Sequence, residues 1–171
     1  MEDAVGIIIS IILFSFIITG VTVTHTTSTE EKMVQEYVDL KTTQFVDSVR
    51  SNGYMSQQMY MTYIQDLLRT GNVYELKMTK EHPSYVPVYD DNGDFTNDYQ
   101  ENMQKSYEKE IIDQVMSGDD YTFSKNDYFY VEVYSKNVTV NSKVLEVFIG
   151  IFPQTKTIHT YYGGAIRNER L

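Results

Sequence analysis

Residues Ala4 to Val23 form an unbroken run of 20 uncharged, mostly apolar residues near the start of the chain. At about 1.5 Å rise per residue, a helix of this length reaches about 30 Å, which matches the hydrocarbon thickness of a bilayer. No Lys or Arg precedes the run, and it is longer than the usual signal-peptide core of about 7–15 residues. The run therefore predicts a retained membrane anchor, over residues 1–24, rather than a removable signal.

The composition limits what the rest of the chain can be. The 171 residues leave room for one compact domain after the anchor. A net charge of -10 makes nucleic acid an unsuitable partner, because its phosphates would be repelled. The chain has no cysteine, so disulfides, thiolate zinc sites and a cysteine nucleophile are excluded. We expect no cofactor.

The helix is predicted to continue beyond the membrane to about residue 50. After Val23, neither Pro nor Gly occurs before Gly53, so nothing in the sequence interrupts a helix. The apolar residues of this stretch recur at helical spacing, which predicts an amphipathic continuation over residues 25–52 that packs on a domain. These residues are Val34, Tyr37, Val38, Phe45 and Val49.

Residues 53–171 are predicted to form an α+β domain. Ser56 can cap a helix over about residues 57–69, and alternation over 73–80 predicts a half-buried strand. Pro83 and Pro87 limit the stretch that follows to an edge strand or a loop. A further helix is predicted over 99–116, where apolar residues recur every four positions. The C-terminal third predicts an antiparallel meander of strands over residues 128–134, 138–140, 143–152 and 157–166. The expected fold is thus a long hydrophobic helix that continues into an amphipathic helix on a C-terminal antiparallel sheet, with two additional helices.

This layout resembles that of type IV pilin-like proteins, and in particular the pseudopilin-like membrane proteins of Tad (tight adherence) systems of Gram-positive bacteria. The segment from Thr70 to Met78 (TGNVYELKM), which follows a helix and precedes His82-Pro83, is similar to a stretch that recurs in them. The resemblance implies a structural subunit or minor component of a surface filament used in adhesion, or of its assembly machinery. Its implied partners are the membrane and other pilin-like subunits or assembly-platform proteins, and its first 24 residues would act as anchor and filament core.

Six residues near the N-terminus are candidate assembly residues. In pilin-like proteins a Glu at the fifth mature position pairs with the amine of a neighbouring subunit. Position 5 here is Val, and the resemblance gives this role to Glu2 or Asp3 at a shifted register. The alternative is an ordinary helix start at the aqueous interface. Two pairs of small residues at four-residue spacing could let helices approach closely in lipid, or could simply face lipid. They are Gly6 with Ser10, and Ser15 with Thr19.

The acidic stretch from residue 90 to residue 101 has the ligand spacing of a calcium loop. Its six candidate oxygen ligands are Asp90, Asn92, Asp94, Thr96, Asp98 and Glu101. The sixth loop position, which requires glycine, holds Phe95, and Gly93 comes two residues early. We therefore favour a solvated Asn-Gly turn that leads into a capped helix.

No catalytic motif is recognisable, so we expect a protein that is not an enzyme. His25, His82 and His159 fall in a neck, a pre-proline loop and a strand, and they suggest neither a metal triad nor an acid–base pair.

The side of the membrane is predicted differently by two arguments. Lys32 and Lys41 follow the hydrophobic run and no basic residue precedes it, which by the positive-inside rule favours an internal domain. The resemblance implies an exterior domain, and we expect a single-pass protein with an extracytoplasmic domain, or a subunit of a cell-surface filament. The alternative function is a monomeric membrane-tethered binding module, whose Tyr-rich sheet recognises a protein or a glycan.

Overall fold

The computed structural model describes residues 2–136 and 158–169, except for the side chains of residues 2–4, 16–17 and 19–28. The strands predicted over 138–140 and 143–152 lie outside the described residues.

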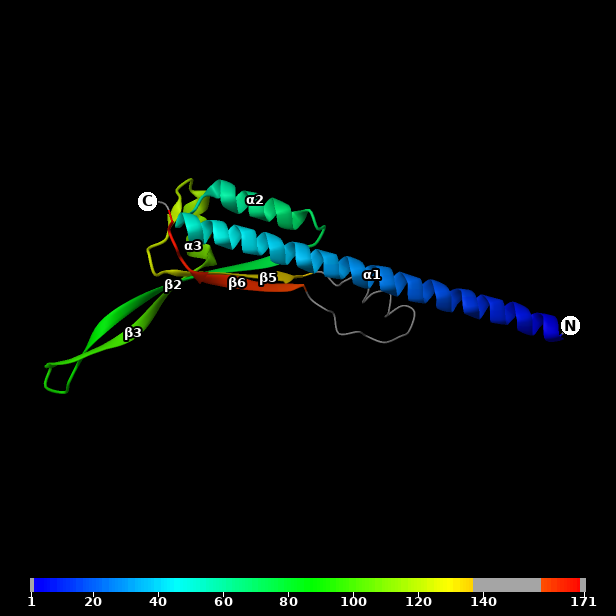
Figure 1. Ribbon diagram of the computed structural model, residues 1–171, viewed down its shortest axis with the longest axis horizontal. Coiled ribbons are helices and arrows are strands. Elements are labelled where there is room, and N and C mark those ends of the chain that lie inside the picture. The colour runs from blue at the N-terminus through cyan, green and yellow to red at the C-terminus, as the bar shows by residue number, and fades with distance from the viewer. Residues whose placement is uncertain (1, 137–157, 170–171) are drawn as a thin grey trace.

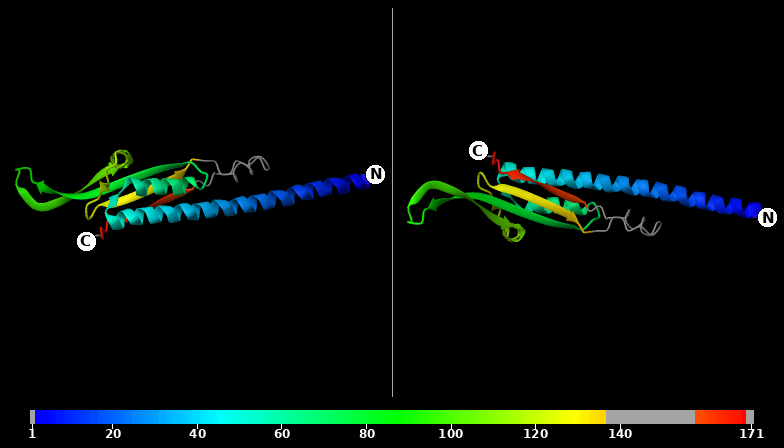
Figure 2. Two further views of the ribbon diagram at one scale, coloured as in Figure 1. Left: turned by 90° about the horizontal axis from the view of Figure 1, so that it is seen from above. Right: turned by 90° about the horizontal axis from the view of Figure 1, so that it is seen from below.

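One continuous helix, α1 (Glu2–Asn52), runs for 51 residues, or about 76 Å, and its N-terminal part projects beyond the rest of the protein (Figures 1 and 2). The helix ends where the first glycine after Gly20 occurs, at a turn containing Gly53. Among the residues that the structure describes in full, no helix is both long enough and apolar enough to cross a membrane. The membrane anchor over residues 1–24 therefore stays a prediction from the sequence.

The remaining elements form an α+β head around one main antiparallel sheet. The sheet has the order β3-β2-β5-β6, and a small second sheet pairs β1 with β4. Among the described residues, α1 and α2 lie on one side of the main sheet (Figure 1). The bounds are β1 (Tyr54–Met55), α2 (Gln57–Leu68), β2 (Tyr74–Tyr89), β3 (Phe95–Tyr107), α3 (Glu108–Met116), β4 (Tyr121–Thr122), β5 (Tyr128–Ser135) and β6 (His159–Ala165).

The core lies between the sheet and the second half of α1. Phe45 of α1 stacks on Tyr63 of α2 at 4.3 Å between ring centroids and meets Phe129 of β5 edge-on at 6.3 Å. The hydroxyls of Thr42 and Tyr63 are 2.8 Å apart, so this buried polar pair is satisfied. The apolar face expected on this part of the helix is therefore the one that packs. The fully buried apolar residues include Val38, Val46, Val49, Met55, Ile111, Val115, Phe129, Val131 and Val133.

The helix predicted after Ser56 is confirmed. The Ser56 hydroxyl accepts a hydrogen bond from the backbone N–H of Met59 at 3.3 Å, which caps α2 as expected.

The helix predicted over 99–116 is wrong in its first part, because residues 95–107 form β3 and only Glu108–Met116 are helical. Positions four apart share one face of a strand as well as one face of a helix, so the spacing of Tyr99, Met103 and Tyr107 fits both. These residues form a strand because they pair with β2, in a register that places Tyr107 opposite Thr79. The sheet thus draws half of its strands from before residue 108, instead of being a C-terminal meander.

β2 continues through both prolines. Its pairing with β5 ends at Glu81, and from His82 onward β3 is the only described strand that pairs with it. Pro83 and Pro87 therefore sit where β2 has one open side, as expected for an edge, because proline cannot donate to a second ladder. Residues 82–104 form a two-stranded ribbon, here called the arm, that projects away from the head at the end opposite the N-terminus (Figure 1).

We expect Phe45→Ala to lower the free energy of unfolding by about 3–5 kcal/mol, because it leaves a cavity between α1, α2 and β5. Leu40→Ala is the matched control on the same helix, since Leu40 is 53% exposed, and its effect should stay within about 0.5 kcal/mol. Urea unfolding followed by near-ultraviolet circular dichroism measures both. Equal losses in the two variants would contradict the assigned core.

Candidate functional site

The N-terminal part of α1 carries apolar side chains on every side of the helix. We call residues 5–18 the stem. Its exposed apolar residues are each at least 50% accessible: Val5, Ile7, Ile8, Ile9, Ile11, Ile12, Leu13, Phe14 and Ile18. A helix that is apolar all round is normally buried, either inside a large protein or in a membrane. The described residues of this chain do not provide that cover, so the stem is the main candidate for contact with something outside the chain.

The small residues of the stem point in two directions. Ser10 donates a hydrogen bond from its hydroxyl to the carbonyl of Gly6 at 2.8 Å, so this pair shares one face. Gly6 and Ser15 are nine residues apart, about two and a half turns, which places Ser15 on the opposite side of the helix. A methyl group added at Gly6 would meet no heavy atom within 4 Å. No other part of the described chain fills the space beside Gly6, so a neighbouring helix could pack closely there.

The acidic candidates at the N-terminus, Glu2 and Asp3, belong to the first turn of α1, and their side chains are outside the described part, as is that of Thr19. Their proposed roles remain predictions.

The structure places the calcium candidates in the turn between β2 and β3 and along β3. The Asp90 carboxylate accepts hydrogen bonds from the backbone N–H groups of Asn92 and Asp94, both at 2.9 Å. The backbone N–H of Asp90 donates to the carbonyl of Asp94 at 2.9 Å and closes the tight turn between β2 and β3. Thr96, Asp98 and Glu101 then follow along β3. Within the described ranges, no three acidic or histidine side chains are grouped to hold a metal. The Asn-Gly turn is confirmed, but it leads into a strand and not into a capped helix.

Asp127 is a fully buried carboxylate that the sequence analysis missed. Its Oδ1 lies 2.5 Å from Nδ1 of His82, and its Oδ2 lies 3.1 Å from Nζ of Lys80 and 2.8 Å from the N–H of Ser124. Burial alone raises the pKa of this carboxyl, but its hydrogen-bond donors outweigh burial and hold the pKa below the usual value. His82 thus belongs to a strand with a carboxylate partner, and not to an isolated pre-proline loop.

His159 also has a carboxylate partner on the outer face of the sheet, the face away from α1. Its Nε2 lies 3.0 Å from Oε1 of Glu132, and its ring stacks on Tyr134 at 4.8 Å. The hydrogen bond from Tyr134, followed by that from His159, lowers the pKa of Glu132. Both pairs join residues that are far apart in sequence, which is why spacing alone did not find them.

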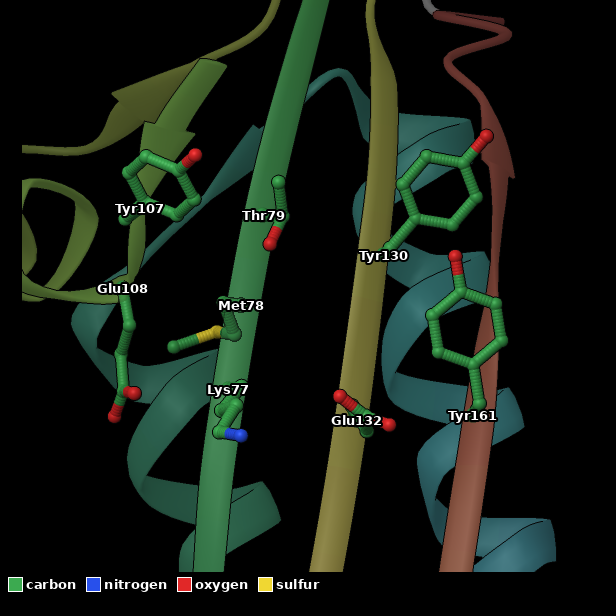
Figure 3. Close-up of a pocket in the computed structure, with 8 residues that line it drawn as sticks. All are labelled: Lys77, Met78, Thr79, Tyr107, Glu108, Tyr130, Glu132 and Tyr161. Atoms are coloured by element: carbon green, nitrogen blue, oxygen red, sulfur yellow. The ribbon is translucent and has the colours of Figure 1, made fainter.

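Tyrosines follow the strands of this outer face. Tyr130 and Tyr161 are stacked with centroids 5.7 Å apart and planes 10° apart, and Tyr128 continues the row at 6.4 Å from Tyr130. A shallow depression of about 260 Å³ lies over β2, β5 and β6 and is bounded by the start of α3 (Figure 3). Its lining residues are Lys77, Met78, Thr79, Tyr107, Glu108, Tyr130, Glu132 and Tyr161.

The arm exposes a second group of apolar side chains. Tyr89, Phe95 and Tyr99 form a chain of ring contacts with centroids 6.0 and 5.4 Å apart near the tip. A two-stranded ribbon is only marginally stable in water by itself. The other exposed apolar residues of the arm are Tyr85, Val86 and Met103.

Comparison with known proteins gives no relative. No family model matches the chain, and no curated protein and no solved structure matches it either. Function must therefore be argued from the residues and surfaces described above.

We expect Asp127→Asn to destabilise the head by about 3 kcal/mol at pH 7, because Lys80 loses its buried counter-charge. The pKa of Asp127 is lowered in the folded state. Its contribution is therefore complete above the unfolded value of about 3.9 and is lost as pH falls through the folded pKa. The gap between wild type and variant should shrink below about pH 4, which urea unfolding at pH 7 and pH 3 measures. Asp119→Asn, at an exposed position, is the control; a gap independent of pH would contradict the assignment.

Proposed function

We propose that this protein is a structural subunit, or a minor component, of a type IV pilus-like filament of the Tad type or of its assembly machinery. The observation that carries the proposal is the stem: an apolar helical segment, exposed on all sides, that is continuous with the helix holding the head together. A subunit of this design needs lipid around the stem before assembly and neighbouring helices around it afterward.

The membrane part of the proposal rests on the sequence. The run from Ala4 to Val23 contains no charge and is long enough to span the hydrocarbon of a bilayer. We place the head on the extracytoplasmic side, following the pilin-like layout. Glu2 and Asp3 would then lie at the far end of the span, where one of them could pair with the N-terminal amine of a neighbouring subunit.

Packing, and not hydrophobicity, would select the partner of the stem. Moving an apolar helix from lipid into a helix bundle removes little apolar surface from water, so close contact at small residues sets the specificity. Gly6 and Ser15 lie on opposite sides of α1, so a copy could be contacted by one neighbour at Gly6 and Ser10 and by another at Ser15 and Thr19. Unlike contacts on two sides generate an open helical array when the rotation between neighbouring copies does not close into a ring.

A second candidate function is a monomeric membrane-tethered binding module. The depression on the outer face of the sheet favours it, because that depression does not depend on assembly. The two functions differ in where the protein is found: a filament subunit is released in sheared surface fibres, whereas a tethered module stays with the membrane.

We expect Gly6→Leu to reduce the amount of protein in sheared fibres by at least tenfold, because leucine would hold neighbouring helices apart. The side chain has free space within the chain, so folding should be unchanged. Ile9→Leu, at another exposed stem position, keeps size and apolarity and is the matched control. Immunoblots of sheared and membrane fractions measure the distribution. Wild-type protein found only in membranes would remove the filament proposal.

A separate experiment tests on which side of the membrane the head lies. Protease added to intact cells should cut the head and leave a membrane-protected fragment that contains the stem. A head that is cut only after the cells are opened would place it inside, as the positive-inside count favours.

A further inference from the structure

We propose that the depression on the outer face of the sheet binds a neutral saccharide, with the rings of Tyr130 and Tyr161 as its stacking platform. This inference does not depend on the stem, so it applies both to a filament subunit and to a tethered module.

The platform is built by a glycine. Gly163 of β6 pairs with Tyr130 of β5, and a Cβ at Gly163 would lie only 2.3 Å from Cδ1 of the Tyr130 ring. The Tyr130 ring therefore occupies the space above β6 that a side chain at position 163 would otherwise fill. Figure 3 shows the rings of Tyr130 and Tyr161 with their flat faces turned outward from the sheet. Tyr161 is 60% exposed, so its ring is open to a ligand.

Flat aromatic faces bind the C–H surfaces of sugar rings. The face of an aromatic ring carries the negative part of its quadrupole, and the C–H groups of a pyranose carry small positive charges. Figure 3 shows the two rings side by side, and their planes are 10° apart, so together they present one broad surface. A depression of about 260 Å³ is slightly smaller than the usual ligand pocket of about 300–1,000 Å³. It therefore suits one or two sugar units lying on the surface.

Polar groups surround this platform on the side of β2 and α3. Lys77 and Thr79 come from β2, Glu132 from β5, and Glu108 from the first turn of α3. Together they offer an ammonium donor, a hydroxyl and two carboxylate acceptors, the groups that bind sugar hydroxyls. Tyr107, which is 63% exposed, forms the far wall.

The charges of the lining argue against an anionic ligand. An anion would face the carboxylates of Glu108 and Glu132, and the single ammonium of Lys77 balances only one of these two charges. Because Lys77 interacts favourably with both carboxylates, it partly neutralises them. A neutral ligand with many hydroxyls meets no such repulsion. The tyrosines also stabilise the sheet as cross-strand pairs, and the experiment must separate this structural role from binding.

The test uses the full chain in a zwitterionic detergent, because alkyl glycosides would themselves present sugars. Maltohexaose and chitohexaose are the neutral probes, and tetramethylammonium and inorganic phosphate are the charged ones. Isothermal calorimetry at millimolar probe concentration should show saturable binding of a neutral probe that changes little with added salt, since no ion pairs form. Binding of neither neutral probe, or tighter binding of a charged probe, would overturn the proposal.

Variants separate binding from stability. Tyr161→Ala should weaken binding about five- to tenfold through the loss of one stacking ring. Tyr85→Ala is the matched control, because Tyr85 is 67% exposed but belongs to the arm. Melting temperatures of all variants are measured in parallel. Unchanged affinity in Tyr161→Ala with a lowered melting temperature would assign the tyrosines to sheet stability alone and refute the proposal.

Discussion

Burial of the second half of α1 against the main sheet is the interaction on which the rest of the protein depends. Val38, Val46 and Val49 are completely buried there, and Phe45 links the helix to both α2 and β5. Because α1 is one uninterrupted helix, this packing also fixes the direction in which the stem leaves the head. The described backbone contains no loop between the two, so the position of the stem follows from the core.

The C-terminal segment completes the attachment of the sheet to α1. Backbone N–H groups of Arg167 and Asn168 donate to the carbonyl of Arg50, and that of Glu169 donates to the carbonyl of Ser51. The Arg50 side chain donates in turn to the carbonyl of Ala165 at 3.0 Å. The end of the described chain is therefore bound to the end of the helix, and β6 is held against α1 by hydrogen bonds as well as by apolar contact.

The two faces of the sheet have different chemistry because side chains alternate along a strand. In β5, Phe129, Val131 and Val133 point toward α1 and are fully buried, whereas Tyr130 and Glu132 between them point outward. The inner face supplies the stability of the head. The outer face is thereby free to carry tyrosines, charges and the depression that we assign to a saccharide, and mutations there can alter binding with smaller effects on the core.

The sequence by itself determined the features that depend on local interactions. The length of α1 follows from the absence of Gly and Pro between Val21 and Asn52, the start of α2 from the Ser56 cap, and the first part of β2 from alternation over residues 73–80. Tertiary structure alone decided what depends on distant residues. β3 formed instead of a helix because β2 was available to pair with it, since its apolar spacing fits either structure. Asp127 contacts His82, which is 45 positions away in the sequence, and Tyr130 of β5 lies beside Gly163 of the neighbouring strand β6. Strand register creates these contacts. Register is fixed by the face that the whole sheet buries and by the turns that join its strands, and not by the spacing of residues within one strand.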